Sequence, residues 1–276
     1  MNIIEITDIA SPELDLYVRL TGRELRRATE VTGGVFIAES PTVVSVALAS
    51  GCEPISLLTD KRLLSSASVS DIIEKIGDIP IYVAEESVLR SLTGFALTRG
   101  VLAAMKRPEP KDAGELLRNA KRVAILEAVA DSTNIGSIFR SAAALNMDAV
   151  LVTPDCCDPL SRRAARVSMG TVLQVPFATV GEGVDWQDKG FPILKEYGFT
   201  TAALALTDNS VSITDERLSE AEKIALILGT EGTGLRQKTI DLCDFTVKIP
   251  MSHGVDSLNV ACAATVAFYQ FGILKR

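Results

Sequence analysis

The sequence predicts an α/β protein with two domains, the second of which contains a parallel sheet. The chain has 276 residues, of which 47% are hydrophobic, and this is enough to build a core in each of two domains. Short apolar runs alternate with helical segments along most of the chain, a pattern typical of α/β folds. In the second half these runs are apolar almost throughout, which indicates parallel strands covered on both faces.

The first part of the chain is predicted to form a small α/β unit. A polar and basic helix is expected over residues 14–30, and an apolar strand is expected at 35–38. Ser40 and Pro41 suit the start of a helix over 42–48, because Pro fits a first helical turn. Apolar runs at 55–58 and 81–83, separated by a helix over 70–76, continue the alternation.

The boundary between the domains is predicted near residue 108. Residues 107–114 contain Pro108, Pro110 and several charges, which interrupt both the helical and the strand periodicity. We therefore expect an N-terminal domain at residues 1–108 and a C-terminal domain at residues 109–276.

The C-terminal domain contains strand candidates that are mostly separated by helical segments. They are residues 123–126, 149–152, 172–175, 201–206, 224–228 and 245–249. The last segment, 258–274, is apolar nearly all round, but Thr265 and Gln270 interrupt it and it is too short for a membrane span. Such a helix must be buried, either in its own core or against a second subunit.

Charge argues against a protein whose whole surface binds nucleic acid. The net charge is −7 and the sequence pI is about 5.0. Basic residues nevertheless fall in groups, which a fold can gather into one basic face or leave as ordinary solvated surface. The groups are Arg19, Arg23, Arg26 and Arg27; Arg99, Lys106, Arg107 and Lys111; Arg118, Lys121 and Arg122; and Arg162, Arg163 and Arg166.

The sequence also predicts a cytoplasmic protein with no membrane segment and no metal site. The N-terminus lacks the pattern of a secretory signal, and no apolar run is long enough to cross a bilayer. The five cysteines include no C-x-x-C spacing. His253 is the only histidine, which nearly excludes a multi-histidine metal site.

Three polar loops carry the residues that indicate chemistry, and the first is N-I-G-S-I-F-R at 134–140. Asn134 lies where a helix is expected to start, and it is suited to cap that helix. Arg140 lies on the same helix face as Gly136, so its guanidinium can lean over the space that glycine leaves and reach an anion at the helix mouth. The alternative for Arg140 is an ion pair with an acid such as Asp131.

The second loop is G-T-E-G-T-G at 229–234, directly after a strand candidate. It lacks the lysine of a phosphate-binding P-loop and has a different glycine order from the dinucleotide fingerprint. Its glycines would still let a ligand approach the backbone closely. Glu231 would then lie at the carboxyl edge of the sheet, where α/β proteins bind ligands.

The third loop, I-P-M-S-H-G-V-D-S-L-N-V at 249–260, precedes the final helix. Ser257 has an ordinary explanation as a helix cap. Asn259 needs hydrogen-bond partners if it is buried just inside an apolar helix. This loop is the most informative stretch of the chain.

In their order and spacing, the three loops resemble the motifs of the SpoU/TrmH family of RNA ribose methyltransferases, within the SPOUT superfamily. The resemblance covers about residues 123–269, and residues 161–177 also fit the family. The N-terminal part more loosely resembles the small ribosomal-protein-like α/β domain that many members use to capture RNA.

The resemblance implies a deep trefoil knot in the C-terminal domain, S-adenosyl-L-methionine as the cofactor, and a homodimer with the catalytic pocket at its interface. General folding rules argue against a knot, so the knot rests on the resemblance alone. By position in the motifs, the residues expected to contact the cofactor are Leu206 or Thr207, Gly229, Ile249 and Leu258.

The resemblance also implies the catalytic residues. Arg140 should serve the ribose 2′-hydroxyl, and Asn134 and Glu231 should shape its surroundings. Ser257 and Asn259 should orient Arg140 or the RNA. A guanidinium normally keeps its proton, so Arg140 either has a perturbed pKa and acts as the base, or only positions the hydroxyl beside a phosphate.

The RNA substrate is less well defined than the reaction. The extra N-terminal domain favours large-subunit ribosomal RNA over transfer RNA, by analogy with the family. A transfer-RNA methyltransferase and a non-catalytic RNA-binding protein of the same fold are the alternatives. A dinucleotide enzyme would need a glycine fingerprint after residues 123–126, where the sequence offers only Gly136.

Overall fold

The computed structural model of the protein describes residues 2–8, 10–18, 24, 34–93, 100–183 and 185–273. The chain forms two compact units, the N-terminal unit with Met1–Glu109 and Leu160–Leu173, and the C-terminal unit with Pro110–Pro159 and Gln174–Arg276. The segment Leu160–Leu173 packs with the N-terminal unit although it lies after the expected boundary. The domains at 1–108 and 109–276 stay a prediction.

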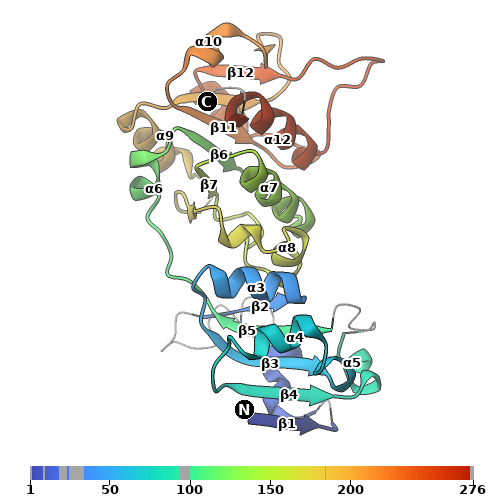
Figure 1. Cartoon of the computed structure of the whole chain (residues 1–276). Helices are drawn as coiled ribbons and strands as arrows, with labels where there is room; N and C mark the ends of the chain where they lie inside the picture. The colour runs from blue at the N-terminus through green and yellow to red at the C-terminus, as the bar shows by residue number, and fades with distance from the viewer. Residues whose placement is uncertain are drawn as a thin grey trace. The chain divides into compact units, whose positions relative to one another are not determined.

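The N-terminal unit is built on a mixed five-stranded sheet with the strand order β1-β4-β3-β5-β2 (Figure 1). Strands β1, β4 and β3 are parallel, and β5 pairs antiparallel with β3 and β2. The strands are β1 (Asn2–Ile6), β2 (Val35–Glu39), β3 (Pro54–Asp60), β4 (Pro80–Ala84) and β5 (Val101–Lys106). The runs predicted at 35–38, 55–58 and 81–83 are β2, β3 and β4, whereas β1 and β5 were not predicted.

Helices cover this sheet. Leu14 of η1 (Pro12–Leu14), Tyr17 of α1 (Asp15–Val18) and Leu89 of α5 (Glu86–Thr93) pack into one buried cluster with strand residues. Helix α3 (Pro41–Ala49) contacts β2, β5 and α4 (Ala67–Ile73). It begins as predicted, with Pro41 in its first turn and Ser40 Oγ accepting the Val43 N–H at 3.4 Å. A 3-10 turn, η2 (Lys61–Leu63), follows β3. Most of the helix predicted over 14–30 lies outside the described residues.

Two arginines of one basic group are bound to an acid within the N-terminal unit. Arg162 and Arg166 of α8 (Arg162–Val167) contact the two carboxylate oxygens of Glu39 at 2.8 and 3.0 Å. The Glu39 side chain is only 10% exposed, whereas the side chains of Arg162 and Arg166 are 32% and 34% exposed, so the carboxylate is the shielded partner. Arg163 is exposed. The group at Arg19 to Arg27 and Arg99 lie outside the described residues.

The C-terminal unit contains a seven-stranded sheet in the order β10-β12-β9-β11-β6-β7-β8, and every pairing in it is parallel. Five of these strands agree with the predicted runs to within two residues. The α/β class with a parallel sheet is therefore confirmed. The strands are β6 (Arg122–Leu126), β7 (Ala149–Val152), β8 (Phe177–Thr179), β9 (Thr200–Leu204), β10 (Val211–Ser212), β11 (Ile224–Leu228) and β12 (Phe245–Lys248).

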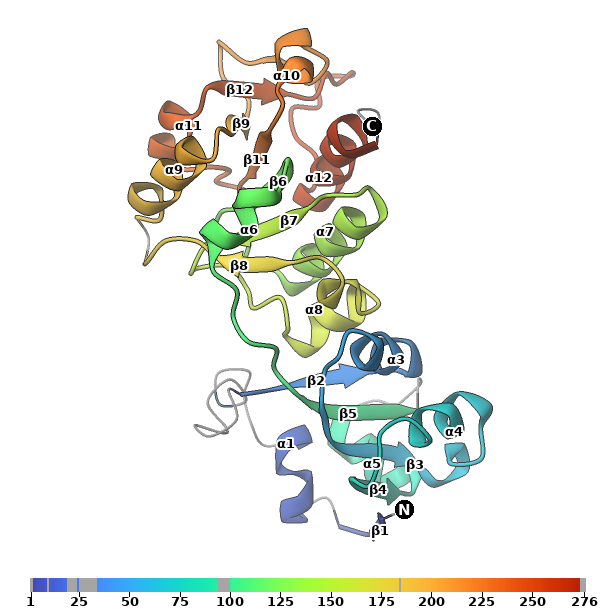
Figure 2. The ribbon, with the colours of Figure 1, turned by 60° about the vertical axis from the view of Figure 1, so that its left-hand side comes forward.

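Helices lie on both faces of this sheet (Figures 1 and 2). Helices α6 (Ala113–Asn119), α9 (Gln187–Glu196) and α11 (Gln237–Leu242) surround one buried cluster, which includes Trp186. On the other face, α7 (Ser132–Ala144) packs against α12 (Val260–Phe268). A short helix, α10 (Glu216–Glu220), precedes β11.

The strand predicted at 172–175 is wrong. These residues begin with the 3-10 turn η3 (Thr171–Leu173), and the strand β8 follows Pro176. Gly170 has a φ of 85°, and its carbonyl accepts the Leu173 N–H at 3.0 Å, which closes a turn. A short apolar run can be a buried turn as well as a strand, and periodicity does not separate the two.

The helix caps differ from those predicted. Asp131, not Asn134, caps α7, because its side chain accepts the Thr133 N–H. Asn259, not Ser257, caps α12, since its Oδ1 accepts the Ala261 N–H at 2.9 Å. The predicted caps Asn134 and Ser257 therefore do not cap these helices.

The last described segment is π-helical, η4 (Tyr269–Ile273), and it follows α12 directly. The guanidinium of Arg122, in strand β6, donates to the Phe271 carbonyl at 3.0 Å and to the Glu222 carbonyl at 2.7 Å. This contact holds η4 against the sheet. Among the described residues, no helix is long and apolar enough to cross a membrane.

Candidate functional site

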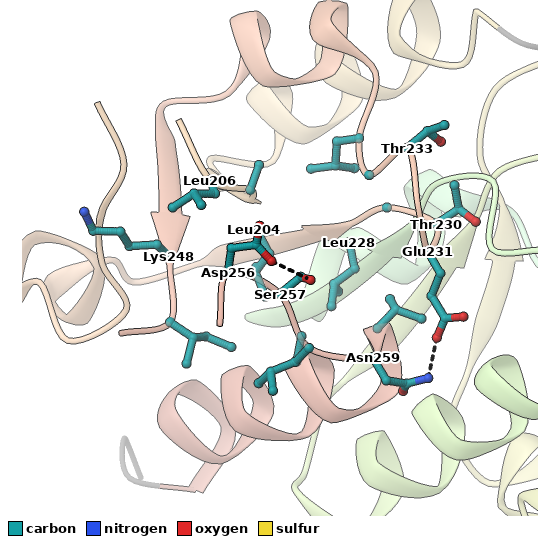
Figure 3. Close-up of a pocket in the computed structure, with 18 of the residues that line it drawn as sticks. Leu204, Leu206, Leu228, Thr230, Glu231, Thr233, Lys248, Asp256, Ser257 and Asn259 are labelled. Atoms are coloured by element: carbon teal, nitrogen blue, oxygen red, sulfur yellow. Dashed lines mark hydrogen bonds between the residues drawn. The ribbon is translucent and has the colours of Figure 1, made fainter. Parts of the chain in front are cut away.

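A cavity of about 560 Å³ lies at the carboxyl ends of β9, β11 and β12. Loops that follow parallel strands leave space at this edge of a sheet, and α/β proteins bind ligands there. Most of the wall comes from residues 204–206, from the glycine loop (229–235) and from residues of the final loop (249–259) (Figure 3). Two of the three polar loops of the sequence therefore meet at one cavity.

The glycine loop folds back on itself directly after β11. Thr230 and Gly234 form an isolated antiparallel bridge, with the Gly234 N–H on the Thr230 carbonyl at 3.1 Å. A Cβ added at Gly229 would lie 2.3 Å from the carbonyl carbon of Gly234, so only glycine fits there. Gly232 has a φ of 90°, which also favours glycine. The glycines make this tight fold possible and leave backbone on the cavity wall.

Three polar side chains from three separate segments form an amide–carboxylate cluster at the cavity rim: Asn134, Glu231 and Asn259. Asn134 Nδ2 donates to Glu231 Oε1 at 3.1 Å, and Asn259 Nδ2 donates to Asn134 Oδ1 at 3.0 Å. Asn259 Nδ2 also contacts Glu231 Oε1, as Figure 3 shows. Two amide donors thus hold one carboxylate oxygen of Glu231. The structure brings together three of the five predicted catalytic residues.

Ser257 and the predicted cofactor residues of the final loop also line the cavity. Ser257 Oγ donates to Asp256 Oδ1 at 3.1 Å, and both side chains face the cavity. Ile249 and Leu258 are in the wall, and Leu258 is 42% exposed. Leu206 also lines the cavity and is 60% exposed although it is a large apolar residue. Exposed leucines at a cavity mouth indicate a surface that a ligand covers.

Arg140 and Thr207 do not line this cavity. Arg140 is exposed on α7, and it makes no hydrogen bond or ion pair with any residue that the structure describes, including Asp131. Thr207 instead holds its own turn, with its N–H on Ser210 Oγ at 2.7 Å. Of the predicted cofactor residues, Leu206, Gly229, Ile249 and Leu258 therefore lie in the wall.

The sequence reasoning missed several residues of the site. Thr230, Thr233, Lys248 and Asp256 line the cavity, and their positions within or beside the polar loops were a usable signal. Glu127, buried just after β6, was also missed. Within the described ranges, no group of His, Cys, Asp or Glu side chains is arranged to hold a metal ion.

Comparison with known proteins gives a consistent result. Residues 121–269 match the model of the SpoU rRNA Methylase family. An uncharacterized tRNA/rRNA methyltransferase of Mycobacterium tuberculosis is 41% identical over 98% of this chain and 92% of its own length. The 23S rRNA (guanosine-2'-O-)-methyltransferase RlmB of Acinetobacter baylyi is 32% identical over 76% of this chain and 84% of its own length.

Solved structures share the fold over nearly the whole chain. An AdoMet-bound rRNA methyltransferase from Sinorhizobium meliloti superposes with a TM-score of 0.78, at 22% identity, and covers 97% of each chain. The SpoU methyltransferase AviRb from Streptomyces viridochromogenes, also in complex with AdoMet, has a TM-score of 0.76 at 22% identity and covers 94% of this chain and 97% of its own.

The fold and these matches define an RNA methyltransferase. The chain belongs to the SpoU rRNA Methylase family, which confirms the resemblance that the three loops predicted.

Proposed function

We propose that this protein transfers a methyl group from S-adenosylmethionine to a ribose 2′-hydroxyl, and that its substrate is large-subunit ribosomal RNA. The observation that carries the proposal is the amide–carboxylate cluster at the rim of a cavity walled by a glycine loop. The RlmB relative of Acinetobacter baylyi is named for a 2′-O transfer to guanosine in 23S rRNA, and this supports both the hydroxyl and the RNA.

The cavity fits the cofactor. Its volume of about 560 Å³ lies within the range of small-molecule sites. Leu206, Ile249 and Leu258 provide apolar surface for a flat ring, and the loop around Gly229 provides polar backbone. When bound there, S-adenosylmethionine supplies a methyl group activated by a sulfonium. Because Thr207 does not line the cavity, we assign the predicted contact at this strand end to Leu206.

The cluster orients Glu231 for the sugar. Asn134 and Asn259 both donate to Oε1, and no described residue donates to Oε2. Oε2 is therefore available to accept the hydrogen bond of a ribose hydroxyl. This hydrogen bond would align the hydroxyl oxygen with the methyl group, and such alignment supplies most of the rate of a methyl displacement. Ser257, held by Asp256, adds a second hydroxyl-binding group at the rim.

We further propose a homodimer in which Arg140 acts at the partner's cavity. The outer face of α12 and η4 presents Val266, Tyr269 and Ile273, which are 39%, 53% and 42% exposed and share one helix face. A second copy would cover this apolar face. Arg140 lies on α7, the neighbour of α12, and is exposed, which suits an arginine that places an RNA phosphate beside the partner's cluster.

Mixed dimers test this arrangement. Arg140→Ala and Glu231→Gln each remove one part of the site, so each homodimer should be inactive while S-adenosylmethionine binding persists. Coexpression should restore about a quarter of wild-type turnover, because half of randomly formed dimers pair the two variants and hold one complete site. If Arg140 acts within its own chain, coexpression restores nothing. Sedimentation gives the oligomeric state independently.

The remaining family features follow from the resemblance. After β12 the chain places α12 beside β11 and α7. We propose the trefoil knot from the family resemblance. A crystal structure in which the main chain of the C-terminal domain passes through no loop of the same chain would contradict the knot. We assign RNA capture to the domain at 1–108 and catalysis to the domain at 109–276. A cytoplasmic location remains an expectation.

The reaction is tested by incubating the protein with total RNA and methyl-labelled S-adenosylmethionine. We expect label in one ribosomal RNA nucleotide, at a ribose that makes the neighbouring phosphodiester resistant to alkali. Label in transfer RNA would change the substrate but keep the reaction. Label in a base would overturn the proposed ribose transfer, and cofactor binding without label in any RNA would favour a non-catalytic protein.

A further inference from the structure

A buried carboxylate lies behind the cavity, outside the predicted site. Glu127 follows β6 directly and is 1% exposed. Its Oε2 accepts hydrogen bonds from Trp186 Nε1 at 2.6 Å, from Gln187 Nε2 at 3.3 Å and from the Thr239 hydroxyl. Burying an ionised carboxylate is costly unless hydrogen bonds compensate for the lost water. The hydrogen bonds to Glu127 provide this compensation, which indicates a structural role for the buried carboxylate.

Glu127 binds both ends of the glycine loop. Its backbone N–H donates to the carbonyl of Leu228 at 2.8 Å, just before the loop begins. Its Oε1 accepts the backbone N–H of Arg236 at 2.7 Å, just after the loop ends. One residue thus fixes the entry and the exit of residues 229–235, all of which line the cavity.

A simpler role, balancing the charge of Arg236, does not account for the geometry. The Arg236 guanidinium is 3.9 Å from Glu127 Oε2, whereas it makes a close contact with Asp155. The carboxylate of Glu127 instead accepts hydrogen bonds from the Arg236 backbone N–H and from the side chains of Trp186 and Thr239. Its contacts set the path of the main chain.

We propose that Glu127 is a positioning residue for the methyl donor, which holds the glycine loop in the conformation that receives S-adenosylmethionine. The inference rests on the proposed function of the cavity. It concerns the pre-organisation of the binding site, so its effect should fall on cofactor affinity more than on the turnover of the saturated enzyme.

The main test is Glu127→Gln, which keeps the shape but places an amide group among donors. We expect the Kd for S-adenosylmethionine, measured by calorimetry, to rise about 10- to 100-fold, the scale of a lost hydrogen bond to a charged group. At saturating cofactor and RNA, kcat should stay within about 3-fold, because Glu231 and its amide donors are unchanged. A lowered Tm with unchanged Kd would make Glu127 an ordinary core residue and overturn the proposal.

Asp155→Asn is the matched control. It breaks the side-chain ion pair of Arg236 but leaves the Arg236 N–H on Glu127. We expect a Kd within about 3-fold of the wild type, since the loop end stays anchored. A rise in Kd equal to that of Glu127→Gln would show that the arginine side chain holds the loop, and would refute the assignment to Glu127.

A measurement on the wild-type protein covers the case in which Glu127→Gln does not fold. The Arg236 amide, bonded to a buried carboxylate, should exchange with deuterium far more slowly than the amides of Gly232 and Thr233 at the loop tip, in the absence of cofactor. Equal exchange rates at these three amides would overturn the proposal that Glu127 holds the end of the glycine loop. If the wild type does not bind S-adenosylmethionine, the proposed function fails. The exchange rates still test, independently, whether Glu127 holds the end of the glycine loop.

Discussion

The two loops that wall the cavity are held in opposite ways. The glycine loop is fastened at both ends to Glu127, carries an internal bridge and packs so tightly that Gly229 has no room for a Cβ. The final loop has one internal turn, with the Val255 N–H on the Ser252 carbonyl at 3.2 Å, and it is exposed from 252 to 259. We therefore expect the first wall to be formed before a ligand binds, and the exposed part of the second to adjust when it does.

The largest effect is expected from Gly229→Ala, in the preformed wall. The new methyl group would lie 2.4 Å from the Leu235 backbone nitrogen as well as against Gly234, so the loop must shift. Overpacking of this kind costs about 1–3 kcal/mol, and we expect a Tm lowered by several degrees and a Kd for S-adenosylmethionine raised at least about 100-fold. Calorimetry and thermal melting check this, with wild-type affinity in the variant as the contrary result.

The next effect is expected where the final loop joins the cluster. Asn259→Ala removes the cap of α12 and both amide contacts to Asn134 and Glu231. Turnover should fall about 100-fold, the scale of a misplaced catalytic group. Loss of the cap should cost about 0.5–2 kcal/mol of stability.

Asn259→Asp separates these two roles of Asn259. Aspartate still accepts the Ala261 N–H and caps the helix, but its second oxygen would face Glu231 Oε1 and repel it, so the cap should be retained while turnover is lost. If the Asp variant turns over normally, the donor contact is unimportant for catalysis.

A smaller effect concerns the ion pair beside the anchored end of the glycine loop. Burial alone would raise the pKa of Asp155, but hydrogen bonds from Thr153 and Arg236 outweigh it and lower that pKa. A lowered folded-state pKa adds stability above the unfolded value of about 4, and this stability is lost as the pH falls through the folded pKa. Asp155→Asn should therefore lower the Tm at neutral pH, and the difference from the wild type should shrink in acid. A difference that stays constant with pH would contradict the ion pair.

The smallest effect is expected from Gly254→Ala in the final loop. Gly254 has a φ of 71°, but a Cβ there meets no atom within 4 Å, and the surrounding loop is exposed. Alanine at this positive φ is strained, but the new methyl group displaces no atom of the cavity wall, so the Kd should change less than about 3-fold and the Tm should fall by about 2–4 °C. If this variant costs as much affinity as Gly229→Ala, the final loop is as preformed as the glycine loop, and the contrast between them fails.

The sequence predicted the parallel sheet well because buried parallel strands are uniformly apolar. It failed where that signal is ambiguous. Residues 172–175 include three apolar residues but begin with a turn that buries Val172, and the alanine-rich β5 has no marked strand propensity. The caps were misplaced by two or three residues, since Ser257, Asn259, Asp131 and Asn134 are all acceptable cap residues.

The candidate site was predictable in its residues but not in its contacts. The three loops contain Asn134, Glu231 and Asn259, yet their hydrogen bonds depend on a strand order that places β11 beside β6. Glu127 was missed for a related reason. An acid at the end of a strand resembles a solvated rim residue, and its burial comes from Trp186 and Thr239, which are far away in the chain.

Trp186 makes the anchored loop observable without a label. It is the only tryptophan of the chain, it is fully buried, and its ring stacks on Phe191 at 5.4 Å between centroids while its indole N–H is bound to Glu127. All intrinsic tryptophan emission of this protein therefore originates beside Glu127, the residue proposed to fix the cavity wall. A spectral shift on titration with a ligand, or its disappearance in a variant, would report the state of that wall optically and in real time.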